Sequence, residues 1–320
     1  MVNPVFPDAC DRFPGRHIFQ SMKTILTILL LMTSLIPAVA EDFKPGKNDK
    51  AALLMVHFGT TYPQTRAETI EAINARAVKE FPEMDVFEAY TSRIVMRKLA
   101  EKGIVKKSPR DMLMKLASEG YTHVFIQSTN VIDGIEAEAL RTEAQMMVPF
   151  FKDIRVGNPL LYSLEDCQKV ADILSRRYSE CAEGKKSAVV MVGHGTHTPA
   201  TAIYSQIDNI FKATGHPAFH VATIEGYPTF ETMEAALKGA GVKKVTLVPF
   251  MFVAGDHARN DIDTEWREQL TDKGFNVETR IEGLGQIPEI QEIYMDHIRS
   301  GLKSRPLSAS ERKAAFLNLP

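Results

Sequence analysis

The chain has 320 residues, of which 44% are hydrophobic and 24% are charged, a composition typical of a globular protein with a large buried core. Its length predicts two domains, or one domain built from two halves. The formal net charge of -2 lacks the basic excess of nucleic-acid-binding proteins, so nucleic acid is not an expected partner.

The N-terminal segment has the pattern of a secretory signal peptide. A lysine precedes an apolar run at residues 25–36, and Ala38-Val39-Ala40 follows as a cleavage site. The run is short for a membrane span, and a buried core helix is the alternative. Residues 1–40 are therefore predicted to be removed, with 1–21 interpreted as a possible upstream extension of the reading frame. The mature protein is expected in the periplasm and is not expected to span the membrane.

Beyond this segment, short β-branched runs alternate with longer helical patterns. Such alternation, with strands that are apolar on both faces, is typical of a doubly wound α/β fold with parallel sheets. The polar tail at residues 304–320 has no pattern and is expected to be mobile. The predicted strands are Ala52–His57, Val86–Ala89, His123–Gln127, Ile154–Val156, Ala188–Val192, His220–Ile224, Lys244–Phe250 and Asn276–Thr279. The predicted helices are Gln64–Glu80, Arg93–Lys102, Arg110–Glu119, Glu136–Phe151, Leu164–Cys181, Pro199–Ala213, Phe230–Gly239, Asp261–Lys273 and Pro288–Leu302.

The two halves of the chain resemble each other in sequence. Leu-Met-Val-His-Phe-Gly-Thr at residues 54–60 matches Val-Met-Val-Gly-His-Gly-Thr at 190–196, and two further pairs of segments follow in the same order. We therefore predict two similar α/β halves, 41–160 and 161–303, that face each other across a cleft. Ligands of open α/β sheets bind at the carboxyl ends of the strands, so the matching loops are the expected site.

Three residues of the second half could share a metal ion. His194, Glu225 and His257 each lie just beyond a predicted strand. Two imidazoles and one carboxylate can hold a divalent first-row metal and leave coordination positions open. The glycines that flank His194 would let the backbone approach a bulky ligand closely. The simpler alternative is that each histidine is an ordinary surface or hydrogen-bonded residue.

Two other histidines and both cysteines of the mature chain receive structural interpretations. His197 could be a fourth ligand but is better explained as the start of the following helix, and His57 is interpreted as structural or as support for the site. Cys167 and Cys181 lie on one predicted helix, about 21 Å apart by its rise per residue. A disulfide needs Cα atoms within about 7 Å, so none is predicted.

These motifs resemble the class II chelatases, and most closely the anaerobic-type sirohydrochlorin cobaltochelatases. The resemblance runs in order from about residue 50 to residue 302, and Val-Ala-Gly-Asp-His-Ala at 253–258 is its most specific part. The matching stretches lie at residues 56–62, 89–99, 126–128, 191–195, 224–228, 248–261 and 283–285.

The resemblance implies a role for particular residues. His194, Glu225 and His257 would bind the metal, His194 would also accept a proton, and Glu136 would line the cleft and take part in catalysis. Thr60 and Gly195 are assigned to substrate binding.

Basic residues at 93–98 could bind the substrate. Arg93, Arg97 and Lys98 lie on one predicted helix, and guanidinium groups match the geometry of carboxylates. The alternative is that these side chains only solvate the helix.

The function implied is a sirohydrochlorin cobaltochelatase, which inserts Co²⁺ into the open tetrapyrrole with release of two protons. The metal would be a substrate, with Fe²⁺ or Ni²⁺ as alternatives to Co²⁺, and no organic cofactor is expected. The tetrapyrrole is the expected partner, and a homo-oligomer is expected.

Four other functions remain open at this point. They are a periplasmic carrier of tetrapyrrole, haem or metal, a sirohydrochlorin ferrochelatase, a zinc hydrolase with a metal-bound water, and a phosphatase with a catalytic histidine. The phosphatase would need an arginine beside its histidine, whereas Gly193 stands there.

Overall fold

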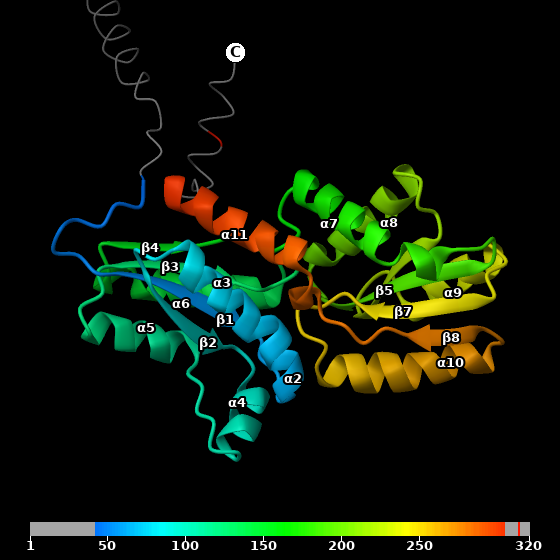
Figure 1. Cartoon of the computed structure of the whole chain (residues 1–320), viewed down its shortest axis with the longest axis horizontal. Coiled ribbons are helices and arrows are strands. Elements are labelled where there is room, and N and C mark those ends of the chain that lie inside the picture. The colour runs from blue at the N-terminus through cyan, green and yellow to red at the C-terminus, as the bar shows by residue number, and fades with distance from the viewer. Residues whose placement is uncertain (1–41, 305–312, 314–320) are drawn as a thin grey trace, which may run out of the picture. The chain divides into compact units, whose positions relative to one another are not determined.

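The computed structural model describes residues 42–304 and Lys313 (Figure 1). The predicted signal peptide with its upstream extension, and nearly all of the predicted tail, lie outside the described residues. Among the residues described, every helix is too short or too polar to cross a membrane.

The first half contains a parallel sheet of four strands in the order β2-β1-β3-β4. Its strands are β1 (Ala51–His57), β2 (Asp85–Tyr90), β3 (His123–Ser128) and β4 (Asp153–Val156). Its helices are α2 (Pro63–Arg66), a π-helical stretch (Ala67–Glu71), α3 (Ala72–Glu80), α4 (Arg93–Ala100), α5 (Pro109–Ser118), α6 (Ile135–Met147) and a 3₁₀ turn (Val148–Phe150).

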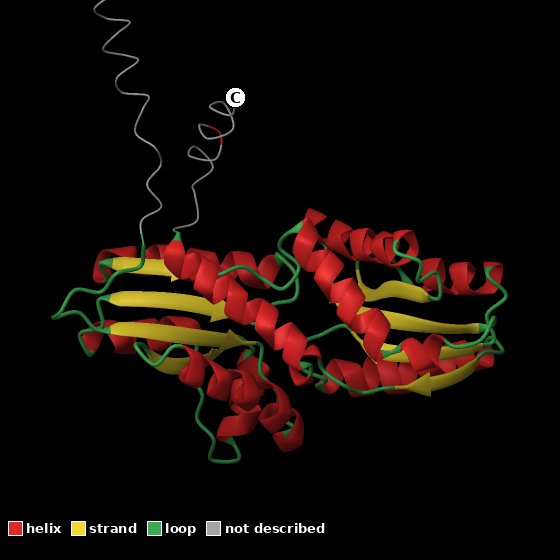
Figure 2. Ribbon diagram, turned by 45° about the horizontal axis from the view of Figure 1, so that its top comes forward, coloured by secondary structure: helices red, strands yellow, loops and turns green. Residues whose placement is uncertain are grey.

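The second half repeats this arrangement, with strand order β6-β5-β7-β8, again parallel (Figure 2). Identical strand orders confirm the predicted fold class of two similar α/β halves. The strands are β5 (Ser187–Gly195), β6 (Phe219–Glu225), β7 (Lys244–Pro249) and β8 (Asn276–Thr279). The helical segments are α7 (Leu164–Arg177), 3₁₀ turns Ser179–Ala182 and Pro199–Thr201, α8 (Ala202–Ala213), α9 (Phe230–Gly239), a π-helical stretch (Ala258–Trp266), α10 (Arg267–Asp272), a 3₁₀ turn (Leu284–Gln286) and α11 (Pro288–Lys303).

Each central strand is buried on both faces, as its apolar sequence predicts. In β1 every residue from Ala51 to His57 is buried. Successive side chains of a strand point to opposite faces, so Leu53 and Met55 join one hydrophobic cluster with α3 while Ala52 and Leu54 join another with α5 and α6. β5 divides its side chains between two clusters in the same way.

One hydrophobic cluster runs through both halves. It includes Met55 of β1 and Met191 of β5, together with buried residues of α3, α7, α8 and α11. The C-terminal helix α11, assigned to the second half by its sequence position, contacts β3 of the first half as well as α7. The two halves therefore share one core on this side of the molecule.

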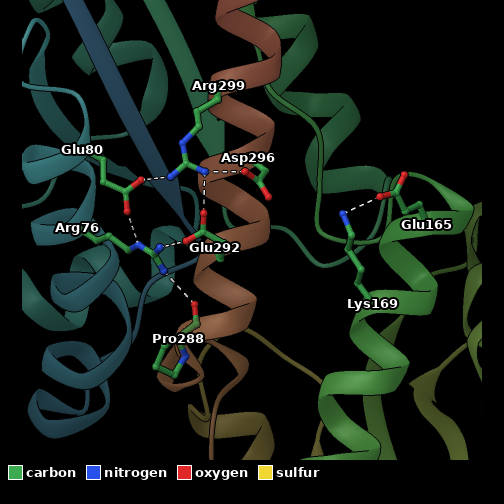
Figure 3. A network of polar contacts seen from close by, with 8 residues as sticks. All are labelled: Arg76, Glu80, Glu165, Lys169, Pro288, Glu292, Asp296 and Arg299. Carbon is green, nitrogen blue, oxygen red and sulfur yellow. Dashed lines mark hydrogen bonds and ion pairs between the residues drawn. The ribbon is translucent and has the colours of Figure 1, made fainter.

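Charged side chains join α11 to α3 above that core (Figure 3). Arg76 of α3 contacts Glu292 and donates a hydrogen bond of 2.9 Å to the carbonyl of Pro288. Arg299 of α11 contacts Glu80 of α3. Because these pairs connect residues more than 200 positions apart, they fix α11 on the first half.

Some element boundaries differ from the predicted ones. β5 continues to Gly195, because its last residues stay in register with β6, so His194 lies within the strand and not beyond it. The helix that begins at Leu164 ends at Arg177, and Cys181 lies in the 3₁₀ turn that follows. Cys167 and Cys181 are both free thiols.

Candidate active site

The rings of His194 and His257 meet at the carboxyl ends of the second sheet. Their centroids are 4.8 Å apart, with the planes at 86°. His194 is the penultimate residue of β5, and His257 immediately precedes the π-helical stretch that follows β7. The sequence predicts that these two imidazoles lie close together, and their rings are close together in the structure.

The other side of the His257 ring contacts a carboxylate. Nδ1 of His257 lies 2.7 Å from Oδ2 of Asp261, one helical turn later. A hydrogen bond at Nδ1 leaves Nε2 of the ring available to a metal ion, the arrangement that carboxylates commonly impose on metal-binding histidines. Asp261 was not identified from the sequence, although its spacing of four residues on a helix was visible there.

Glu225 lies near this pair but points to another partner. It ends β6 beside Gly195 of β5, and its Oε2 lies 3.6 Å from Nε2 of His197. Within the described part of the chain, no three His, Cys, Asp or Glu side chains are arranged to hold one metal ion. Shared coordination by His194, Glu225 and His257 therefore stays a prediction, and it requires the exposed Glu225 side chain to change rotamer.

The glycines beside His194 already have packing roles. A Cβ on Gly193 would lie 2.4 Å from the ring of Tyr204, and one on Gly195 would lie 1.4 Å from the carbonyl oxygen of Glu225. Gly195 also has φ +89°, which disfavours any other residue. Approach to a ligand stays a prediction for these residues, whereas the contact between β5, β6 and α8 requires both glycines.

His57 is buried and structural. Its Nδ1 lies 3.0 Å from Oγ1 of Thr129 and its Nε2 lies 3.0 Å from Oδ1 of Asn74. The ring stacks on Phe252 of the second half, with centroids 6.1 Å apart. Burial lowers the pKa of His57 to about 4, so the ring is neutral near pH 7. Both ring nitrogens have protein partners, which supports the structural interpretation.

A cavity of about 570 Å³ lies between α4, α5 and α6 of the first half. Arg93 and Glu136 both line it, together with Arg110, and its volume is in the range of small-molecule sites. A Cβ on Gly134, two residues before Glu136, would lie 3.9 Å from Cβ of Thr196, so the start of α6 adjoins the loop after His194. The expected substrate-binding Arg93 and cleft-lining Glu136 thus share one cavity.

The remaining basic residues of α4 do not line that cavity. Arg97 is exposed one turn after Arg93. Lys98, which the sequence grouped with them as a ligand for carboxylates, instead pairs with Asp256 of the second half at 3.2 Å.

Thr60 lies where the two halves meet. Its hydroxyl accepts a hydrogen bond of 3.3 Å from the backbone N–H of Tyr62 and would lie 3.7 Å from a Cβ on Gly255. The Thr60 side chain is buried. Its assignment to substrate binding stays a prediction.

Two residues of the first half contact the segment around His257. The hydroxyl of Tyr62 interacts with the carboxylate of Asp256, and the guanidinium of Arg259 lies 4.6 Å from the centroid of the Tyr62 ring. Partial burial alone would raise the pKa of Asp256, but the Tyr62 hydroxyl and the Lys98 ammonium group hold it below its ordinary value. Nothing in the sequence signalled these contacts, because the partners lie far apart in the chain.

Comparisons with known proteins agree on one family. The family model described as cobalt chelatase (CbiK) matches residues 51–303. The sirohydrochlorin cobaltochelatase of Salmonella typhimurium is 35% identical over 258 residues, which cover 79% of this chain and 97% of that protein. The sirohydrochlorin cobaltochelatase CbiKC of Nitratidesulfovibrio vulgaris is 30% identical over 275 residues, which cover 82% of this chain and 96% of that protein.

Solved structures share the fold at lower identity. SirB from Bacillus subtilis, solved with Fe³⁺, superposes with a TM-score of 0.57 at 14% identity, covering 79% of this chain and 96% of that chain. CbiX, described as the terminal enzyme of sirohaem biosynthesis in denitrifying bacteria, has a TM-score of 0.50 at 17% identity, covering 78% of this chain and 98% of that chain. The paired α/β halves are therefore an architecture that chelatases share.

Proposed function

The chain belongs to the cobalt chelatase (CbiK) family and is a metal chelatase, and we propose that it inserts Co²⁺ into sirohydrochlorin with release of two protons. The observation that carries this proposal is the meeting of His194 and His257 at the carboxyl edge of the second sheet, beside the end of β6 that bears Glu225. Two imidazoles and a carboxylate hold a divalent ion while leaving positions for exchangeable water.

The second half supplies the proposed metal ligands and the proposed proton acceptor. His257, with Nδ1 engaged by Asp261, offers Nε2 to the ion. His194 is the proposed acceptor for a pyrrole proton, since an imidazole can take up a proton near neutral pH. Glu225 would complete the ligand set by turning away from His197.

Substrate binding is assigned to the cavity of the first half. Sirohydrochlorin carries several carboxylate side chains, and Arg93 offers a guanidinium that can bind one of them with two parallel hydrogen bonds. Glu136, on the same cavity, would contact the macrocycle near the loop that follows His194. Arg97, Thr60 and Gly195 are the other proposed substrate contacts.

The test is a metal-by-metal insertion assay on purified protein, followed by the absorbance change of sirohydrochlorin with Co²⁺, Fe²⁺ and Ni²⁺. We expect the highest kcat/KM with Co²⁺. A His257→Ala variant should lose at least about 100-fold in kcat/KM, because removing one ligand destroys the metal site. Its circular dichroism and melting temperature should match the parent, since the His257 side chain is 45% exposed.

Three results would count against the proposal. A His257→Ala variant with full activity would remove that residue from the metal site. Binding of sirohydrochlorin without insertion of any of the three ions would favour the tetrapyrrole carrier. Preference for Fe²⁺ over Co²⁺ would make the protein a sirohydrochlorin ferrochelatase.

We further propose that the protein acts in the periplasm after cleavage behind Ala40. The support is the apolar run at residues 25–36 followed by Ala-Val-Ala. N-terminal sequencing of protein recovered from a periplasmic extract should begin at Glu41, and recovery of uncleaved protein only from the cytoplasm would contradict export. The expected homo-oligomer stays a prediction, which light scattering on the purified protein would test.

A further inference from the structure

A group of four side chains joins the two halves beside the proposed metal site, and we call it the inter-half bridge. It consists of Tyr62 and Lys98 from the first half and Asp256 and Arg259 from the second. Nζ of Lys98 lies 3.2 Å from Oδ2 of Asp256, and the Tyr62 hydroxyl interacts with the same carboxylate. The Tyr62 ring lies against the guanidinium of Arg259, 4.6 Å from centroid to Cζ.

The bridge brackets His257 in the chain. Asp256 immediately precedes this residue and Arg259 follows two positions later, at the start of the π-helical stretch Ala258–Trp266. Side chains of the other half therefore contact one residue on each side of His257, namely Asp256 and Arg259. The His257 ring is held by Asp261. The π-helical stretch is also anchored by Ile262, which is buried in the hydrophobic cluster of the second half.

Lys98 lies on the helix whose first residue, Arg93, lines the proposed substrate cavity. On this helix, α4, Lys98 directly follows Arg97. Lys98 has its charge paired with Asp256, so it is poorly placed to bind a substrate carboxylate. One helix thus contacts the proposed substrate cavity through Arg93 and the His257 segment through Lys98.

We propose that Tyr62 and Lys98 are positioning residues that hold His257 beside His194, so that the first half completes the metal site of the second. The proposal rests on the proposed function, because it takes His257 as a ligand of the inserted ion. Loss of the bridge removes two constraints from the residues around His257 and lets the ring leave its position 4.8 Å from that of His194. The loss acts on the ion and not on tetrapyrrole affinity.

The expected loss of activity depends on how exposed the Lys98–Asp256 ion pair is. The Lys98 and Asp256 side chains are 47% and 42% exposed, so their ion pair alone contributes little. We expect Lys98→Met to lower kcat for Co²⁺ insertion by about five-fold, the upper end of what an exposed ion pair supports. Adding Tyr62→Phe, which keeps the ring against Arg259 but removes the hydroxyl that interacts with Asp256, should increase the loss beyond about ten-fold.

The experiment combines kinetics with hydrogen–deuterium exchange on the full protein. In Lys98→Met, the KM for sirohydrochlorin should change less than two-fold, and amides of residues 258–266 should exchange faster than in the parent. Lys98→Arg should restore both properties, because a guanidinium can also reach Asp256. Lys102→Met is the matched control, since Lys102 is an exposed lysine just beyond α4 with no ion pair in the described structure.

Several outcomes would overturn the inference. A rise in the KM for sirohydrochlorin with kcat unchanged would make Lys98 a substrate ligand. Unchanged exchange at 258–266 in the double variant would show that the bridge does not hold this segment, whatever the activity. Absence of Co²⁺ insertion in the parent protein would refute the proposed function, while the exchange measurement would still decide whether the bridge holds the His257 segment.

Discussion

Two buried histidines make the stability of the folded protein depend on pH. Burial lowers the pKa of His57 and of His220 to about 4, whereas an unfolded histidine titrates near about 6.5. Between these values the unfolded chain binds more protons than the folded one, so the free energy of unfolding decreases as the pH falls through this window. The loss is complete near pH 4 and amounts to about 3 kcal/mol for each ring.

We expect the urea midpoint of the parent protein to fall steeply between pH 6.5 and pH 4.5. His57→Gln keeps hydrogen-bonding groups toward Thr129 and Asn74 but cannot take up a proton, so it should remove about half of this pH dependence. Urea denaturation of both proteins across the window measures the difference. An unchanged pH slope in the variant would show that His57 is not responsible.

Glu225 and His197 allow a sharp comparison at the metal site. Glu225→Gln should lower Co²⁺ insertion by more than about ten-fold, because an amide is a weaker metal ligand than a carboxylate. His197→Ala should stay within about five-fold of the parent, since the His197 side chain is 83% exposed and its ion pair is weak. Equal losses in the two variants would indicate that His197 also serves as a ligand.

Sequence reasoning named candidate site residues but did not describe their surroundings. His194, Glu225 and His257 stand out because chemistry-bearing residues follow successive apolar strands. The rotamer that turns Glu225 toward His197 depends on side-chain packing that no local pattern encodes. The pair formed by Lys98 with Asp256 depends on contacts across 158 positions, which a single sequence does not reveal.

At the scale of single elements, the end of β5 is tightly constrained. Gly195 combines φ +89° with contact to the carbonyl of Glu225, while Gly215 has φ +87° with no atom near its Cβ position. Gly195→Ala should therefore destabilise the protein by clearly more than the cost of about 1 kcal/mol expected for Gly215→Ala from backbone conformation alone. Thermal unfolding compares the two, and equal melting temperatures would contradict the close contact.

Elements were predicted well where the periodicity was strong. Phe230–Gly239 and Asn276–Thr279 have the predicted bounds. The predicted boundaries are wrong where tertiary contacts determine the end of an element. β5 extends through Gly193-His194-Gly195 because the glycines let β6 and α8 approach, and the helix after β7 begins near Ala258 instead of Asp261. The π-helical stretches at 67–71 and 258–266 had no visible signal in the sequence.

At the scale of the molecule, α11 provides the first half with part of its core. Ile290, Ile293, Tyr294, Met295 and Ile298 of this helix are buried. Their burial contributes roughly 1.5–3 kcal/mol each, a sum comparable to the stability of a whole domain. A fragment of residues 42–160, which lacks α11, should therefore be unfolded or molten on its own.

Circular dichroism and amide exchange of that fragment test this expectation. Co-expression with a fragment of residues 161–304 should restore protected amides in β1 and β3, because α11 is then present. A fragment that unfolds cooperatively without α11 would show that the first half is an autonomous domain and would contradict the shared core.

The shared core also limits how a wide, flat substrate can reach the histidines. Phe250 and Phe252, which follow β7, belong to the cluster that includes Met55 and Tyr294, so a rigid swing of one half away from the other would expose this apolar surface to water. Opening the two halves as rigid bodies would therefore cost free energy in this molecule. The substrate is therefore expected to reach the histidines without separation of the two halves, and turnover would then not depend on domain swinging.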